Sequence, residues 1–149
     1  MTHRAISIKR PWPWAIMFLP PEIAKRCENR TWTLPNFVRD TWLWLHSGKV
    51  ADRSTAWDFI ERVSGRRPPD SERGKRETGA IVGCIKFGRD VIPNGSPPSG
   101  WYVGNVGWPI ADACPLREPV PCVGQRGFWV PPEMDGLRMA ELAYRPEVR

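Results

Sequence analysis

Apolar and polar residues alternate along several short segments of the chain, a spacing typical of β-strands with one buried face. The alternation predicts strands over residues 5–9, 28–33, 41–46, 102–110 and 120–130. A longer segment, 79–92, begins with apolar residues on both faces, as in a strand buried between other elements. Tryptophans add to the β character of 28–33 and 41–46, and we expect these two strands to be neighbours.

The first predicted helix is bounded by prolines on both sides. Residues 12–19 follow Pro11, whose fixed φ angle suits the first turn of a helix. The pair Pro20 and Pro21 cannot continue a helix, so we expect the helix to end there. One more helical turn is expected over 22–26.

Two further helices are predicted towards the middle and the end of the chain. Apolar residues recur at helical spacing over 54–63, with Ser54 as the expected N-cap and Gly65 as the terminator. Residues 134–142 are expected to form a C-terminal helix. Short strands combined with a few helices predict an α+β fold built on a small barrel.

The length of the chain fits one domain, which we expect to span residues 1–149. Hydrophobic residues make up 41% and charged residues 26%, which excludes a disordered or collagen-like chain. Residues 66–78 are polar and contain prolines, so we expect an exposed, mobile loop there. The longest apolar run, 14–19, is far shorter than a membrane span, and no signal peptide is recognised. We therefore expect a cytoplasmic protein with no membrane partner.

The formal net charge is +6, with a pI near 9.5, and the first 49 residues carry eight basic and three acidic side chains. Such an excess favours polyanionic partners such as nucleic acid, although a charge that only keeps the chain in solution is the alternative. The four cysteines form no CxxC pair and only two histidines are present. We expect free thiols, a buried Cys84, no metal site and no cofactor.

Nine tryptophans is a high number for this length, and several of them lie beside cations in the sequence. Interleaved basic and aromatic side chains suit a nucleic acid, because phosphates attract the cations and bases stack on the rings. The alternative is that the indoles fill the core. We expect the core role for four of them and leave both roles open for Trp12 and Trp14; the four are Trp42, Trp44, Trp57 and Trp129.

Three charged residues, Lys25, Glu28 and Arg30, fall within six positions where a helical turn leads into a strand. On a strand, Glu28 and Arg30 share one face. If that face lines a cavity, the carboxylate beside the guanidinium stays ionised and accepts hydrogen bonds from a base edge or a ribose hydroxyl. The alternative is a salt bridge that only closes the barrel.

Two weaker signals concern the ends of later strands. His46 follows the second tryptophan-rich segment and is either a ligand contact or a structural hydrogen-bonding group. Gly124 and Gly127 form a GxxG sequence, but it lies inside a predicted strand, so we do not assign phosphate binding to it.

Taken together, five segments resemble an ASCH domain of the PUA-like superfamily, in the family's order and over residues 5–131. The match to the GxKxxExR motif falls on Lys25, Glu28 and Arg30, with Ile23 in place of the glycine. Residues 132–149 form a C-terminal extension beyond the resemblance. The segments are SIKRPWPWAI (7–16), KRCENRTW (25–32), LWLHSGK (43–49), GAIVGCIKF (79–87) and PVPCVGQRGFW (119–129).

The resemblance implies a PUA-like β-barrel of about five to six mostly antiparallel strands flanked by two or three helices. It also implies a cleft that takes nucleic acid, RNA in preference to DNA, or a modified or flipped nucleotide. The motif residues Lys25, Glu28 and Arg30 line this cleft by carry-over from the family. From their neighbourhood in the pattern we add four residues as ligand contacts: Ser7, Lys9, Trp12 and His46.

The resemblance also implies an alternative function, a small metal-independent hydrolase acting on RNA or on an N4-acylated cytidine nucleoside. A bacterial branch of the family removes the acyl group with a lysine and a threonine of the same motif. In this chain Glu28 stands in the place of that threonine, with Thr31 nearby. In this alternative Lys25, Glu28 and Lys9 would be catalytic.

Overall fold

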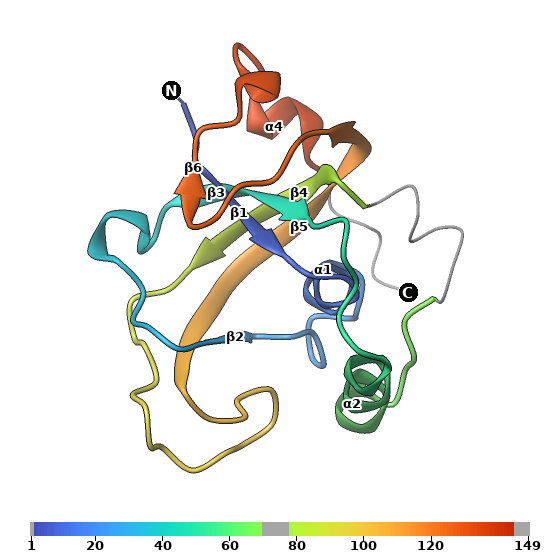
Figure 1. Ribbon diagram of the computed structural model, residues 1–149, viewed down its shortest axis with the longest axis vertical. Coiled ribbons are helices and arrows are strands. Elements are labelled where there is room, and N and C mark those ends of the chain that lie inside the picture. Colours follow the sequence, from blue (N-terminus) through green and yellow to red (C-terminus); the bar gives the residue numbers. More distant parts are fainter. Residues whose placement is uncertain (1, 70–77, 145–149) are drawn as a thin grey trace.

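The computed structural model describes residues 2–69 and 78–144 and shows an α+β fold built on one curled sheet (Figure 1). The sheet has six strands in the spatial order β2-β5-β4-β3-β1-β6. Strands β1 and β3 run parallel, and the other four neighbouring pairs are antiparallel. The expected number of strands and their mostly antiparallel pairing are thus confirmed. The strands are β1 Ala5–Ile8, β2 Cys27–Arg30, β3 Trp42–Ser47, β4 Ala80–Phe87, β5 Val106–Pro121 and β6 Phe128–Trp129.

Three α-helices occur in the described ranges, namely α1 Trp12–Met17, α2 Ser54–Ser64 and α4 Met139–Leu142. Two 3-10 helices, η1 Asn36–Val38 and η2 Pro132–Met134, add one short turn each. No helix in this part of the chain has the length and apolar character needed to span a membrane. Gly65 ends α2 with a φ of 78°, as expected, because glycine adopts the left-handed conformation without a Cβ clash.

Two helix predictions need correction. The N-cap of α2 is Arg53, in an extended conformation with no side-chain cap, while Ser54 is already helical. The C-terminal helix is not continuous over 134–142, because Asp135 is extended and separates η2 from α4. Beyond α4 the described chain returns to the sheet, where Ala143 bridges to Leu116 of β5.

The sheet curls into a half-barrel. The half-barrel is open because its edge strands, β2 and β6, do not pair with each other in the described residues, and side chains span the gap instead. Phe128 of β6 stacks on Trp108 of β5, with ring centroids 6.0 Å apart. Phe128 also meets Trp32, which follows β2, at 6.2 Å. Arg30 of β2 reaches across to β1, where its Nη2 donates to the carbonyl of Ser7 at 3.3 Å.

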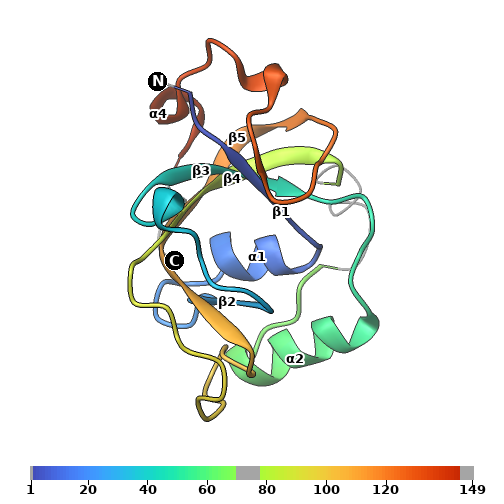
Figure 2. The ribbon, with the colours of Figure 1, turned by 60° about the vertical axis from the view of Figure 1, so that its left-hand side comes forward.

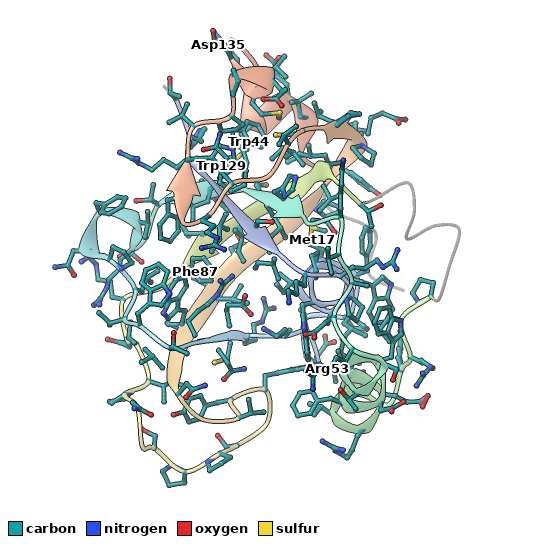
Figure 3. The ribbon with its side chains drawn as sticks, in the orientation of Figure 1. Met17, Trp44, Arg53, Phe87, Trp129 and Asp135 are labelled. Atoms are coloured by element: carbon teal, nitrogen blue, oxygen red, sulfur yellow. The ribbon has the colours of Figure 1, made fainter. Side chains whose placement is uncertain are left out.

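The core lies on both faces of the sheet. On the concave face, Ile16 and Met17 of α1 pack against strand residues, and α2 covers the other side of α1 through Ile60 (Figure 2). On the opposite face, Trp44 and Trp129 pack with the C-terminal segment, away from Met17 and Phe87 (Figure 3). The core role is confirmed for Trp44, Trp57 and Trp129, which are buried, and Trp42 is half-buried against the same cluster. All four cysteines are buried thiols outside any disulfide, which confirms the expected thiol state and the expected burial of Cys84.

Three strand predictions are wrong in detail. Strands β2 and β3 are not neighbours: β2 is an edge strand of the described sheet and pairs with β5. The connection after β2 buries Leu34 and Val38 as it crosses to β3. The strands expected over 102–110 and 120–130 are instead one long strand, β5, followed by a loop over 122–127 and the short β6. The strand expected over 79–92 ends at Phe87. Of the loop predicted over 66–78, residues 70–77 lie outside the described residues, and the rest contains no helix or strand.

Candidate functional site

A cavity of about 810 Å³ opens beside β1, beyond the point where β6 stops pairing with that strand. Most of its walls come from four segments far apart in the sequence, β1, β2, the segment 48–52 after β3, and the loop 122–127. Trp12 of α1 and His46 of β3 are also part of the lining. The curl of the sheet brings β2 opposite β1, and the loop closes the remaining side. The volume lies within the range of about 300–1,000 Å³ that is usual for ligand pockets.

The lining of this cavity is basic and partly aromatic. Four cationic side chains face two carboxylates, which leaves an excess of two positive charges; the cations are Lys9, Arg30, Lys49 and Arg126, and the carboxylates are Glu28 and Asp52. Trp12, Trp32 and Phe128 supply rings to the same lining. Such a cavity attracts an anion and offers apolar faces to a planar group.

The predicted trio forms one connected network across the back of the cavity. The Nζ of Lys25 donates to the carbonyl of Cys27 at 2.5 Å and to Oε1 of Glu28 at 2.8 Å. The Nη2 of Arg30 donates to the other carboxylate oxygen, Oε2, at 3.1 Å. The exposed fraction of the side chain rises from 2% for Lys25 to 9% for Glu28 and 29% for Arg30. Lys25 therefore anchors the carboxylate from inside, while Arg30 faces the cavity.

This network decides the protonation of Glu28. Burial alone would raise the pKa of the Glu28 carboxyl, but the charges and hydrogen bonds of Lys25 and Arg30 outweigh burial and hold the pKa below its ordinary value. Glu28 is thus a carboxylate at neutral pH. Lys25 donates to one carboxylate oxygen and Arg30 to the other, and each oxygen has the capacity to accept a further hydrogen bond, so Glu28 is a fixed acceptor at the cavity wall.

Trp12 is held in place by polar contacts and by a cation. Its Nε1 donates to Oδ2 of Asp52 at 2.7 Å, and the Nζ of Lys25 lies 5.3 Å from its ring centroid. Phe59 of α2 meets the indole edge-on at 5.9 Å. Burial would raise the pKa of Asp52, but the Trp12 hydrogen bond and the charge of Lys9, among other contacts, hold it below its ordinary value. The indole is therefore a rigid wall of the cavity.

Ser7 and His46 are directly opposite each other in the β1–β3 register, and their side chains meet. Ser7 Oγ lies 2.9 Å from Nδ1 of His46, and His46 Nε2 lies 2.8 Å from the carbonyl of Cys122. Burial lowers the pKa of His46 and outweighs the Cys122 carbonyl and the charge of Glu133, which both raise it. The imidazole is therefore neutral at pH 7.

The structure brings six of the seven expected ligand residues into the lining of the cavity: Ser7, Lys9, Trp12, Glu28, Arg30 and His46. Lys25 is absent from that lining and borders a neighbouring cavity of about 550 Å³ on the side of α2. The two cavities share Trp12, Glu28, Asn29 and Asp52. The open hollow and the mutually neutralising salt bridge, which the sequence left as alternatives, thus occur side by side.

Several residues of the lining are not among the seven expected ligand residues. Trp32, with 43% of its surface exposed, lies at the rim of the cavity. Lys49 and Arg126 supply two of the four cations of the lining. The GxxG sequence of Gly124 and Gly127 could have indicated the loop 122–127, but these glycines were assigned to a strand over 120–130. Gly124 packs on His46, since a Cβ at Gly124 would lie 2.5 Å from the ring Cε1.

The chemistry that these residues offer is charge attraction, stacking and hydrogen bonding from fixed groups. Thr31, the nearest hydroxyl to the motif in sequence, is exposed and is not part of the lining. Within residues 2–69 and 78–144, no group of three or more His, Cys, Asp or Glu side chains is placed to hold a metal ion. Neither a protein-family model nor a curated protein matches this chain.

Proposed function

We propose that this chain binds single-stranded nucleic acid, RNA in preference to DNA, by taking one base or modified base into the cavity beside β1. The observation that carries the proposal is the lining of this one cavity of about 810 Å³. The lining combines four cations, three aromatic rings and the fixed carboxylate of Glu28. The proposal includes an ASCH-like fold of the PUA-like superfamily. The order of the five sequence segments and the half-barrel support that part of it.

Each group in the lining has a counterpart on a nucleotide. The cations Lys9, Lys49 and Arg126 are exposed and suit the phosphates, which carry most of the affinity of nucleic-acid binding. Glu28 and Arg30 present an acceptor and donors side by side, a pattern that suits the polar edge of a base. The half-exposed indole of Trp32 at the rim suits stacking on a base face.

The test measures binding of a fluorescein-labelled single-stranded RNA, and of the matching DNA, by fluorescence anisotropy over a series of salt concentrations. Affinity is expected to fall steeply with salt, and Lys9→Ala is expected to reduce the slope of log K against log salt by about 0.7. Arg117→Ala is the matched control, because Arg117 is an exposed cation of β5 outside the lining. An affinity that does not respond to salt, or that responds equally to both variants, contradicts the proposal.

The same assay tests the stacking contact. Trp32→Ala is expected to weaken binding by the equivalent of about 1–3 kcal/mol. Phe37→Ala is its control, because Phe37 is 59% exposed and contacts the same Phe128 ring, yet lies outside the cavity lining. Equal losses in the two variants would show that the aromatic cluster acts only through stability.

The hydrolase alternative through Lys25, Glu28 and Lys9 receives less support from the site. A carboxylate whose pKa is held down by two cations is a weak general base. Incubation of the protein with RNA or N4-acetylcytidine and a chelator separates the two functions. Substrate loss that disappears in Glu28→Gln would establish catalysis by this residue.

A further inference from the structure

The strongest chemical arrangement that the binding proposal does not use is the contact between Ser7, His46 and the backbone of Cys122. The carbonyl oxygen of Cys122 only accepts hydrogen bonds, so His46 Nε2, 2.8 Å away, must carry the hydrogen of a neutral imidazole. Nδ1 is then the acceptor, and the hydroxyl of Ser7 donates to it at 2.9 Å. The contacts on the two ring nitrogens thus define the tautomer.

This order of contacts is that of a nucleophile and its base. A serine hydroxyl becomes a nucleophile when an adjacent unprotonated imidazole accepts its proton and a third group orients that imidazole. In this chain the third group is a backbone carbonyl, and burial keeps His46 neutral. His46 is 2% exposed, meets Trp129 edge-on at 5.5 Å and bonds to the Cys122 carbonyl, and these contacts hold the ring against Ser7.

Ser7 is reachable from the cavity and is less buried than His46. It is only partly buried and belongs to the cavity lining. Two glycines flank the pair: a Cβ at Gly48 would lie 3.5 Å from Ser7 Oγ, and a Cβ at Gly124 would clash with the imidazole. Because neither position carries a side chain, the space in front of the hydroxyl stays open.

We propose that Ser7 and His46 form a catalytic dyad that hydrolyses carboxylic esters whose leaving alcohol carries a negative charge. The class of substrate follows from the cavity, because the cations around Ser7 would hold the anionic alcohol portion. Arg30, whose Nη2 donates to the Ser7 carbonyl at 3.3 Å, adds a positive charge beside the dyad, and a nearby cation favours the negative charge that develops during ester hydrolysis. The proposal rests on the geometry of the dyad and is independent of nucleic-acid binding.

The reaction takes two steps. In the first, Ser7 Oγ attacks the ester carbonyl carbon, its proton passes to His46 Nδ1, and the bond to the alcohol oxygen breaks as that oxygen takes the proton. In the second, water attacks the acyl-serine and gives a proton to Nδ1, and the proton then returns to Ser7 Oγ as the carboxylic acid leaves. One water is consumed, and an acid and an alcohol are formed.

The first experiment asks whether Ser7 is a nucleophile at all. The full chain is treated with a fluorophosphonate, and the modified residue is identified by peptide mass spectrometry. Labelling on Ser7, abolished in Ser7→Ala and slowed about 100-fold or more in His46→Gln, is the expected result. Gly48→Val is the variant that keeps the dyad and blocks the approach to Oγ, and it is expected to slow labelling as well. Labelling of another residue, or none, overturns the proposal.

The second experiment tests the class of substrate with two aryl acetates, 4-acetoxybenzoate and its methyl ester, in which methylation removes the negative charge of the leaving phenol. The anionic ester is expected to give a kcat/KM greater by roughly fivefold or more, the size of one favourable charge contact. Far-UV circular dichroism and the unfolding midpoint establish that each variant is folded before its rate is compared. Turnover that survives in folded Ser7→Ala, or a preference for the neutral ester, contradicts the proposal.

Discussion

Lys25 is the residue whose replacement most directly tests the architecture of the site. Its ammonium group lies in the interior, bonded to the Cys27 carbonyl and to Glu28, and the Trp12 ring covers it. Lys25→Met keeps most of the aliphatic volume and removes the charge. Of the two ion pairs that Glu28 makes within the described residues, the one with Arg30 would then remain.

The expected loss follows from the burial of the pair. Removing one partner of a buried ion pair costs about 3–5 kcal/mol, because an uncompensated charge remains. Arg30 still holds the second carboxylate oxygen, so we expect the lower end, about 3 kcal/mol. With a urea dependence of about 2 kcal/mol per molar, the unfolding midpoint falls by about 1.5 M. The double variant Lys25→Met, Glu28→Gln should lose less than the sum of its single changes, by about 1–3 kcal/mol.

The assay is urea unfolding at pH 7 followed by intrinsic fluorescence, for which the nine tryptophans give a strong signal. Lys86→Met is the matched control, because the Lys86 ammonium lies over the Trp42 ring at 5.4 Å, a contact worth about 0.5–1 kcal/mol near the surface. If Lys25→Met shifts the midpoint no further than Lys86→Met, or if the double variant is additive, the buried network does not stabilise the fold and the reasoning is refuted.

Two further predictions concern the sheet. Burial keeps the pKa of His46 below its unfolded value near 6.5, so the unfolded chain binds more protons and the free energy of unfolding should fall as the pH drops from 7 to 5. Denaturant unfolding at each pH measures this change in the free energy of unfolding. If a folded His46→Gln variant keeps the same pH dependence, groups other than His46 cause it. Gly83→Ala should destabilise the sheet by about 3 kcal/mol or more, because its Cβ would lie 2.2 Å from the Met17 Sδ and 2.7 Å from the Cys114 carbonyl. Gly88→Ala meets only contacts of 3.5 Å or longer, so a similar loss there would contradict the packing argument.

Local pattern was sufficient for several features of the molecule. Prolines and helical spacing located α1 and α2, since both signals act within one element. Alternation located the cores of β1, β2 and β3, and a run of apolar residues on both faces located that of β4. The spacing of Glu28 and Arg30 placed them on one face. The alternation pattern did not predict β5 as one long strand. The pairing of β5 with β4 shifts register at Ile81/Gly83 and at Lys86/Phe87, and each shift interrupts the alternation on which the prediction depended.

The amino-acid sequence by itself determined the basic charge, most of the short strands and six of the residues that line the cavity. The tertiary structure decided which of those residues face one another. Arg30 meets Ser7 across 23 positions, and His46 meets Cys122 across 76. Both contacts depend on the curl of the sheet and on the path of the loop 122–127, and neither follows from the period of any single element. Lys25 lies in the interior instead of the cavity for the same reason. The burial of a side chain depends on what packs over it, and the Trp12 ring covers Lys25 only once α1 has folded back onto β2.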